Sequence, residues 1–304
     1  MKVKLCIADA FFLLYLSFFL LYQIFLNDDF LRVIEVFRFY FGFFVFYIYF
    51  KSTDEISLEK LFWLVLVLVP VEALIVNSII SPHTMPNYPS ADASSHFNPG
   101  GYQRPYSFAG NASVASNILV VFLAMYPFKK IAMFFSVFSV FVFSSGSGLI
   151  SLILFFFMRF FRVFFVFLCL FLVFFVVYYS SLVSFLDSFD FKINSKYIDY
   201  LMDFKLNQIA VVFHGFTSMD YLFGNISSLS DGYGGDFGWL YFIAANGVIS
   251  FVVLVFYLLT KVSAKTLMPI VLLLASTFHY PVIFFLSGQI VLGYLIARGS
   301  AKNM

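Results

Sequence analysis

Ionisable residues are scarce in this chain, and those that border its apolar runs are the candidates for chemistry. The stretch SDGYGGDFGW, from Ser230 to Trp239, places Asp231 and Asp236 directly before a long apolar run. Aspartate and histidine can transfer protons, and His214 lies upstream of the same stretch. Arginine presents a fixed fork of donors that suits phosphate, and Arg104 precedes another apolar run. The stretch can be a hinge, a surface turn or the floor of an active site, depending on the elements that position it.

The composition is that of a membrane protein. Of 304 residues, 62% are hydrophobic and 11% are charged, whereas soluble domains carry about a quarter charged residues. Repeated apolar runs of about 20 residues predict transmembrane helices. The net charge of +2 argues against a nucleic-acid partner. Cys6 and Cys169 both lie in apolar runs, so neither a disulfide framework nor a metal site is expected.

The apolar runs predict an all-α polytopic chain of about ten helices, in a single membrane domain that covers residues 1–304. The fifth and sixth runs are short and flank SSGSG, Ser144 to Gly148. At about 1.5 Å per residue, each covers less than a bilayer of about 30 Å. They form either two half-length helices that meet at the turn or one broken helix. The runs are roughly 5–26, 36–50, 61–80, 108–127, 131–143, 149–158, 163–185, 237–260, 267–280 and 282–297.

The distribution of lysine and arginine predicts how these helices are oriented, because cytoplasmic loops are enriched in both. If the two short runs cross the membrane separately, twelve basic residues lie inside and six outside. If they cross only once, the count is nine against nine. We therefore expect ten helices with both termini in the cytoplasm. The twelve inside residues are then Lys2, Lys4, Lys51, Lys60, Lys129, Lys130, Arg159, Arg162, Lys261, Lys265, Arg298 and Lys302.

Two long loops then lie outside, at about 81–107 and 186–236, while the cytoplasmic loops are too short for a nucleotide-binding domain. The chain also has no P-loop and no dinucleotide-binding fingerprint. Substrates therefore arrive from the outer face or from within the membrane. In the second loop, the spacing of SKYIDYLMDFKLNQIAVVFHGF predicts an amphipathic helix on the membrane surface, ending at His214.

A polar stripe follows Arg104 at the start of an apolar run. Asn111 and Asn117 are six residues apart, and Ser113 and Ser116 are three apart, so the four roughly share a side of one helix. A polar stripe that enters the bilayer must face other helices or a wet cavity. Both helix-to-helix hydrogen bonding and a substrate groove would explain it.

Glu72 lies near mid-membrane, where an ionisable residue indicates a functional site. The alternative is a buried ion pair, with Arg38 as the partner. Arg32, Glu35 and Arg38 recur every three residues, which places them on one face at the outer boundary of the membrane. Asp9, near the inner end of the first helix, is interpreted as a packing or snorkelling group.

Four motifs resemble the O-antigen polymerases and ligases of bacterial envelopes, and two of them begin in the first half of the chain. RPYSFAGNASVASNILVVFLA (104–124) resembles the arginine–glycine–asparagine entry of that family into a helix. SSGSGLISLILFF (144–156) resembles the serine and glycine turn between its short helices, without the arginine that many members carry after the serine.

Two further motifs follow in the order found in that family. LFGN (222–225) resembles the end of its large outer loop, with Asn225 in place of a glycine. SDGYGGDFGWLYFIAANGVISFVVL (230–254) resembles its acidic or histidine residue, aromatic run and G-x-x-G helix. Gly247 matches the first of these glycines, and Ser250 replaces the second. The resemblance extends over about 104–260, half of the chain, and the four motifs lie within it.

The resemblance implies an all-helical membrane glycosyltransferase, similar to the GT-C class, in the bacterial cytoplasmic (inner) membrane. Such enzymes act at the periplasmic face on glycans attached to a polyprenyl diphosphate, such as undecaprenyl diphosphate. Polymerases transfer the growing glycan to the next lipid-linked repeat unit, and ligases transfer it to lipid A–core. The resemblance implies no cofactor, neither metal nor nucleotide. The expected partners are the lipid-linked oligosaccharide, a chain-length regulator and a flippase.

Residue roles follow from the resemblance, because glycosyl transfer from a diphosphate needs cations for the leaving group and a base for the acceptor hydroxyl. Arg104 is the first candidate for the diphosphate, and Asp236 or His214 is the candidate base. Phe237 and Trp239 can stack on sugar rings together with Tyr233, or anchor the chain at the interface. The candidates for substrate binding are Arg32, Arg38, Lys196, Lys205, Asn111, Asp231, Tyr233 and Glu72.

Three other interpretations compete with a polymerase. A ligase shares the framework, but ligases more often carry histidine where this chain has Asp236. A flippase or transporter of lipid-linked sugars would explain Glu72 and the nearby charges, yet the runs show no inverted repeat. A structural assembly subunit would not need long polar outer loops.

Overall fold

The computed structural model describes residues 5–53, 56–79, 105, 107–109, 111–126, 130–161, 203, 206–226 and 237–300. Every regular element in these ranges is helical, which confirms the predicted all-α class for them. Most of both predicted outer loops, 81–107 and 186–236, and the whole predicted helix 163–185 lie outside the described residues. The α-helices are α1 (Ile7–Leu26), α2 (Phe30–Phe41), α3 (Phe43–Ser52), α4 (Glu59–Leu74), α6 (Ala112–Met125), α7 (Lys130–Val142), α8 (Gly146–Arg159), α11 (Ser218–Phe223), α12 (Gly238–Lys261), α13 (Leu267–Ser276) and α14 (Leu286–Ser300).

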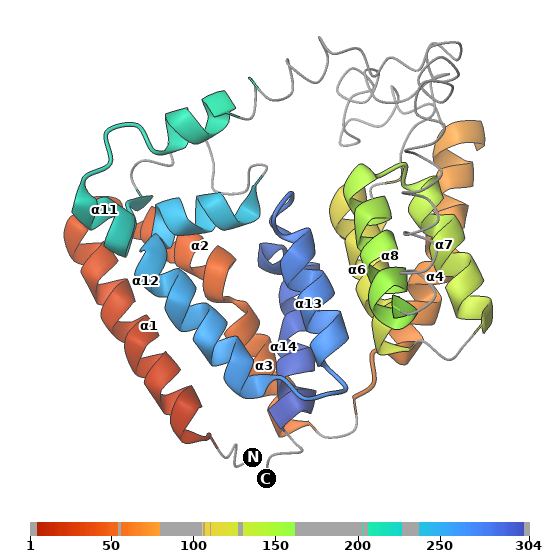
Figure 1. Cartoon of the computed structure of the whole chain (residues 1–304), viewed down its shortest axis with the longest axis horizontal. Coiled ribbons are helices and arrows are strands. Elements are labelled where there is room, and N and C mark those ends of the chain that lie inside the picture. Colours follow the sequence, from red (N-terminus) through yellow and green to blue (C-terminus); the bar gives the residue numbers. More distant parts are fainter. Residues whose placement is uncertain are drawn as a thin grey trace, which may run out of the picture.

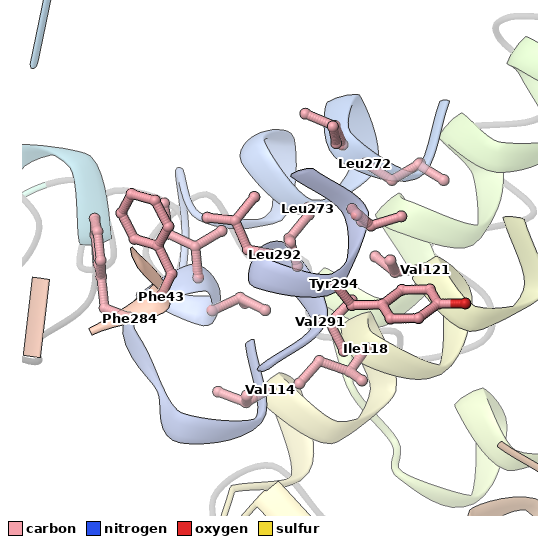
Figure 2. Close-up of a cluster of buried hydrophobic side chains, with 14 of the residues drawn as sticks. Phe43, Val114, Ile118, Val121, Leu272, Leu273, Phe284, Val291, Leu292 and Tyr294 are labelled. Carbon is pink, nitrogen blue, oxygen red and sulfur yellow. The ribbon is translucent and has the colours of Figure 1, made fainter. Parts of the chain in front are cut away.

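The helices form two groups that meet through α13 and α14 (Figure 1). One group contains α1, α2, α3 and α12, and the other contains α4, α6, α7 and α8. α14 packs along α3, and α13 packs against α6 and α8. Figure 2 shows the apolar side chains at this meeting point, among them Phe43, Ile118, Leu273 and Leu292, all of them fully buried. In a bilayer, such close packing holds helices together through van der Waals contact.

Basic residues of α3, α12 and α14 gather at one end of the molecule, which we call the basic end. Lys51 and Lys261 share the carboxylate of Asp9 near the start of α1. Arg298 Nη2 donates to Ile56 O at 2.6 Å. We call the opposite end, which carries α11 and the turn between α1 and α2, the loop end (Figure 1). The grouping agrees with the sequence-based assignment of these cations to one side, although which side of the membrane they face remains a prediction.

Three helices are long and apolar enough to cross a membrane: Ile7–Leu26, Glu59–Ser78 and Gly238–Lys261. The pair α2 and α3, bent by 53°, makes a fourth if the two form one span. The remaining apolar helices α6, α7, α8 and α13 are shorter. The chain therefore has membrane-spanning character, while the predicted ten spans are not reached within the described residues.

Of the two alternatives for the short runs, two helices that meet at the serine and glycine turn describe the structure. α7 ends at Val142, α8 begins at Gly146, and Ser144 between them has a left-handed φ of 49°. Ser145 Oγ, at the head of α8, donates to Ser113 Oγ, at the head of α6, at 3.2 Å. α6 and α8 therefore run side by side in the same direction, and α7, which precedes α8 in the chain, runs in the opposite direction beside them.

The second helix begins earlier than the predicted run 36–50. Asp29 caps α2, because its carboxylate accepts a hydrogen bond from Arg32 N at 3.0 Å. This cap lets α2 include the polar residues before the run, so that Arg32, Glu35 and Arg38 all stand on one helix. The run is then interrupted at Gly42, where α2 passes into α3.

α12 starts as predicted near Phe237 but is not one straight helix. Gly247 has φ 79° and ψ 166°, which lies outside the helical region and breaks the helix. In Figure 1 the part before the break crosses the loop end, and the part after it descends toward the basic end. At 1.5 Å per residue, the descending part from Val248 to Lys261 covers about 21 Å.

Candidate functional site

A groove of about 480 Å³ lies between α2, α3 and the start of α14. We call it the α2 groove. Glu35 and Arg38 supply its charged groups, and their side chains are exposed. The rest of its wall is mostly apolar. The other lining residues are Phe39, Gly42, Val45, Phe46, Phe284, Leu286 and Gln289.

The bend between α2 and α3 shapes this groove. A bend frees backbone carbonyls from their helical partners, and Phe39 O at this bend accepts a hydrogen bond from Gln289 Nε2 of α14 at 2.6 Å. The same Nε2 lies 2.8 Å from Phe284 O and 3.2 Å from Arg38 O, which also accepts from Gly42 N at 3.0 Å. A Cβ on Gly42 would collide with the Gln289 side chain, so the joint needs a glycine. Gln289 therefore holds the backbone from which Arg38 projects.

The position of Arg38 makes it a candidate for binding an anion. It lies in the last turn of α2, about 12 Å along the helix axis from Phe30. Neither Arg38 nor Glu35 forms an ion pair with another described residue. A guanidinium binds phosphate through parallel hydrogen bonds, and the apolar wall suits a hydrocarbon chain, so the α2 groove can hold an anionic amphiphile.

Arg32 lines a different hollow from Arg38, although the two were expected to share a face. This second hollow, of about 340 Å³, lies at the loop end. We call it the polar hollow. Carboxylates, an amide and a guanidinium meet in it, so it offers both acceptors and donors to a ligand rich in hydroxyl groups. Its lining residues are Leu26, Asn27, Asp28, Asp29, Arg32 and Ile226.

The motif LFGN packs into the break of α12. Gly224 and Gly247 both have φ of 79°, a value that favours glycine. A Cβ on Gly224 would collide with Ala245 O, and a Cβ on Gly247 would collide with Leu222 O. Two of the motifs that carry the family resemblance are therefore in direct contact.

A capping box at the start of α11 supports this junction. The Thr217 hydroxyl donates to Asp220 Oδ2 at 2.7 Å, and Asp220 N donates to Thr217 Oγ1 at 3.3 Å. Asn225 Nδ2 donates to Asp220 Oδ1 at 3.0 Å, while Asn225 N donates to Ala244 O at 2.8 Å. The hydrogen bonds to the carboxylate, that from the Thr217 hydroxyl foremost, lower the pKa of Asp220. Asp220 thus joins α11 to the LFGN turn and, through it, to α12.

The polar stripe of α6 is used in hydrogen bonds between helices. Ser116 and Asn117 are fully buried. Asn117 Nδ2 donates to Ser147 Oγ at 3.0 Å, and the Ser151 hydroxyl donates to Asn117 Oδ1. Of the two interpretations of the stripe, helix-to-helix hydrogen bonding describes these contacts.

Asn111, a predicted substrate-binding residue, is the N-cap of α6. Its Oδ1 accepts from Ser113 N at 2.8 Å and from Val114 N at 3.2 Å. These two bonds satisfy backbone groups that the first turn of a helix leaves without partners. The side-chain oxygen of Asn111 is therefore occupied within the protein.

The remaining predicted site residues are dispersed. His214 is exposed in the turn after the helical residues 206–212, which agrees with its expected place at the end of a helix. Glu72 is half-buried on α4, and no ion pair joins it to Arg38. Trp239 is buried and donates from Nε1 to Leu274 O at 2.9 Å, so it belongs to the core and cannot stack on a sugar. The predicted residues outside the described ranges are Arg104, Lys196, Lys205, Asp231, Tyr233 and Asp236.

A buried polar cluster at the basic end replaces the expected packing or snorkelling role of Asp9. Its carboxylate is fully buried and accepts from Tyr47 OH at 2.8 Å, Lys51 Nζ at 3.0 Å and Tyr257 OH at 3.0 Å. Lys261 Nζ forms a fourth contact with it, an ion pair. We call this group, with the adjacent Cys6, the Asp9 cluster. The sequence signal for it is the spacing Tyr-x-x-x-Lys, which occurs at the ends of both α3 and α12.

The described residues contain no group of three or more histidine, cysteine, aspartate or glutamate side chains that could hold a metal ion. Comparison of the chain with protein-family models, with curated proteins and with solved structures gives no match. The function is therefore inferred from the chemistry of the grooves and from the motifs.

Proposed function

We propose that this chain is an integral-membrane glycosyltransferase that polymerises lipid-linked glycan repeat units at the periplasmic face of the bacterial inner membrane. It transfers the growing glycan from polyprenyl diphosphate to the next lipid-linked unit. The resemblance of four ordered motifs to O-antigen polymerases supplies the reaction. The structure supplies a groove whose chemistry suits the donor.

The α2 groove is the observation that carries the proposal. A polyprenyl diphosphate has a long apolar chain and a multiply charged head group. The groove pairs an apolar wall with Arg38, whose guanidinium has no ion-pair partner among the described residues. Glu35 beside it would repel a diphosphate, so it favours a place nearer the sugar, whose hydroxyl groups can donate to it. Arg38 and Glu35 thus discriminate between the two parts of the donor.

The reaction is a displacement at the anomeric carbon of the donor sugar. An acceptor hydroxyl forms a bond to that carbon, the bond from the carbon to the diphosphate oxygen breaks, and the hydroxyl proton passes to a base. The diphosphate leaves with the electron pair, and nearby cations stabilise its charge. Arg38 and Arg104 are the proposed cations. Asp236 and His214 are the proposed bases.

The junction between LFGN and α12 adds support from a second part of the molecule. It ties the segment that leads into Asp231 and Asp236 to the transmembrane part of α12. The anchored LFGN turn fixes the point from which the chain continues to these two residues, and fixed positioning of reacting groups favours catalysis. This is what a reaction at the membrane surface requires.

A flippase of lipid-linked sugars is the second candidate, and the break in α12 is the observation that favours it. Discontinuous helices at membrane depth are typical of transporters. A flippase moves the lipid-linked unit across the membrane without forming a glycosidic bond. The two candidates, and the ligase as well, therefore differ in their products.

Deletion of the gene separates the three activities. Loss of a polymerase should leave surface polysaccharide with single repeat units on the core. Loss of a ligase should leave long glycans attached to the polyprenyl diphosphate, and loss of a flippase should leave unpolymerised units on the cytoplasmic side. Surface chains of normal length in the deletion strain would refute the proposal.

Purified protein in proteoliposomes provides the direct test. With a lipid-linked repeat unit as the only substrate, a polymerase should yield a ladder of longer lipid-linked glycans. A flippase should move the unit across the bilayer without changing its mass. Mass spectrometry of the extracted lipids distinguishes these results.

A further inference from the structure

A second apolar groove, of about 510 Å³, lies between α1 and α12. We call it the α1–α12 groove. At the end of the groove that is farther from the basic end, the Tyr15 hydroxyl and Ser250 Oγ lie 2.6 Å apart and form a hydrogen bond. From there it extends along α1 to the basic end. Its lining residues are Ile7, Ala8, Phe11, Phe12, Tyr15, Val252, Val253, Phe256, Tyr257 and Thr260.

The dimensions and surface of this groove suit one lipid chain. From Tyr15 to Ile7 it follows two turns of α1, about 12 Å, which is most of the hydrocarbon depth of one leaflet, about 15 Å. Phe11 and Phe256 on its rims are each 69% exposed. The groove is therefore open to the bilayer along its side.

The lower end of the groove adjoins the Asp9 cluster. Tyr257 lines the groove and also donates to Asp9 Oδ1, and Thr260, which also lines it, is followed directly by Lys261. The groove and the cluster thus share the last turn of α12. Any head group at the end of the groove lies beside the cluster.

The cluster carries more positive than negative charge. The single carboxylate of Asp9 is shared by the ammonium groups of Lys51 and Lys261, which leaves one positive charge without a counter-charge among the described residues. The two lysine side chains are only 8% and 3% exposed. Burying an uncompensated charge is costly, so an anion bound beside the cluster would lower the free energy of the folded protein.

We propose that the α1–α12 groove binds an acyl chain of an anionic phospholipid, whose phosphate group balances the excess positive charge of the Asp9 cluster. Charge complementarity identifies the ligand, because a zwitterionic lipid brings no net negative charge. Lys265 and Arg298 at the same end of the molecule add to the attraction for an anionic surface. This site lies at the opposite end from the predicted chemistry and does not depend on the proposed function.

Fluorescence quenching by brominated lipids locates such a lipid. Trp63 and Trp239 are the two tryptophans of the chain. Both are replaced by Phe, and Phe256→Trp places a single fluorophore in the groove. The protein is reconstituted in phosphatidylcholine vesicles that contain either brominated phosphatidylglycerol or brominated phosphatidylcholine. We expect at least threefold tighter binding of the brominated phosphatidylglycerol, measured from the concentration that gives half-maximal quenching. A fluorophore at Leu64→Trp, on the exposed face of α4, is the matched control and should show no preference.

Charge variants test the cause of this preference in a chain that keeps its native tryptophans. Lys51→Met leaves one carboxylate with one ammonium group, so the cluster becomes neutral. Native mass spectrometry should find one phosphatidylglycerol retained by the wild type and by Lys265→Met, an exposed lysine outside the cluster, but not by Lys51→Met. Cys6→Ser removes the thiol whose Sγ lies 2.9 Å from Lys261 Nζ, and it should retain the lipid.

Several results would overturn the proposal. Equal quenching by the two lipids at Phe256→Trp means that the groove does not select an anion. An equal preference at Leu64→Trp means that the whole surface attracts anionic lipid. Protection of Phe256→Trp from both lipids means that a second copy of the chain fills the groove. Retention of the lipid by Lys51→Met means that the excess charge of the cluster does not bind it. The same conclusion follows if Cys6→Ser retains the lipid and the wild type does not.

Discussion

Gly224 and Gly247 are packed backbone against backbone, and each has a φ of 79°. The contact joins the LFGN turn of the predicted outer loop to the break in α12. Neither glycine has room for a Cβ, because carbonyl oxygens of the opposite segment occupy that space. The break in α12 and the docking of the loop are therefore one structural feature.

Gly247→Ala should disrupt this junction. The backbone conformation at Gly247 is nearly restricted to glycine, and strain of this kind costs about 1–3 kcal/mol. Hydrogen exchange of the α11 amides should therefore become at least fivefold faster. Gly146→Ala is the matched control, because Gly146 has no neighbouring atom within 4 Å of an added Cβ. Unchanged exchange in the Gly247 variant would contradict the proposed docking.

Arg38→Ala should reduce polymerisation without unfolding the protein. A hydrogen bond to a charged group contributes about 1.5–3 kcal/mol, so the rate of chain extension should fall by about tenfold or more. Arg38→Lys should restore only part of the rate, because lysine lacks the bidentate fork. The rate is measured on lipid-linked repeat units in proteoliposomes.

The control for this prediction is the stability of the variant. Arg38 makes no ion pair with a described residue, so the thermal midpoint in detergent should match that of the wild type. A wild-type distribution of chain lengths in Arg38→Ala would show that Arg38 does not bind the donor.

Asp9→Asn should destabilise the chain strongly. Removing the carboxylate leaves two buried ammonium groups, and breaking a buried ion pair in this way costs about 3–5 kcal/mol. Asp29→Asn, at the exposed N-cap of α2, is the matched control, and it should change stability little because asparagine caps a helix about as well as aspartate. Unfolding in denaturant measures both. If the two variants are equally stable, the Asp9 cluster does not hold α1, α3 and α12 together.

The stability of α11 should depend on acidic pH through Asp220. Hydrogen bonds from Thr217 lower the pKa of this carboxyl in the folded chain, so its contribution is fully present above the pH at which an unfolded aspartate titrates. It is lost as the pH falls through the lowered folded pKa. Hydrogen exchange of α11, corrected for the intrinsic pH dependence of exchange, should show this loss. Asp220→Asn should abolish it, and a pH dependence that persists in this variant would assign it to another group.

Local patterns in the sequence were sufficient for the class of fold and for several element limits. Hydropathy predicted the helices, the serine and glycine turn at Ser144 and the start of α12 near Phe237, because these depend on neighbouring residues. The early start of α2 was missed because Arg32 and Glu35 interrupt the apolar run. Asp29 as N-cap was the available signal for it.

Contacts between distant segments could not be derived in this way. Gln289 reaches the carbonyl groups beside Gly42 from a helix about 250 residues away, and Lys261 meets Asp9 over a similar separation. A lone glutamine in an apolar run indicates a buried polar partner but does not identify it. The site was predicted from motifs, and several of its residues lie outside the described ranges, so the α2 groove emerged only from the packing of helices.

The break at Gly247 also affects the membrane around the protein. The descending part of α12 covers about 21 Å, and α7, α8 and α13 span about 15–21 Å, against a hydrocarbon thickness of about 30 Å. Such hydrophobic mismatch makes a bilayer thin locally at a modest free-energy cost. We therefore expect the lipids beside these helices to lie closer together across the membrane. Local thinning would bring the surface of the leaflet closer to the loop end. A large lipid-linked head group would then have a shorter distance to move between the two.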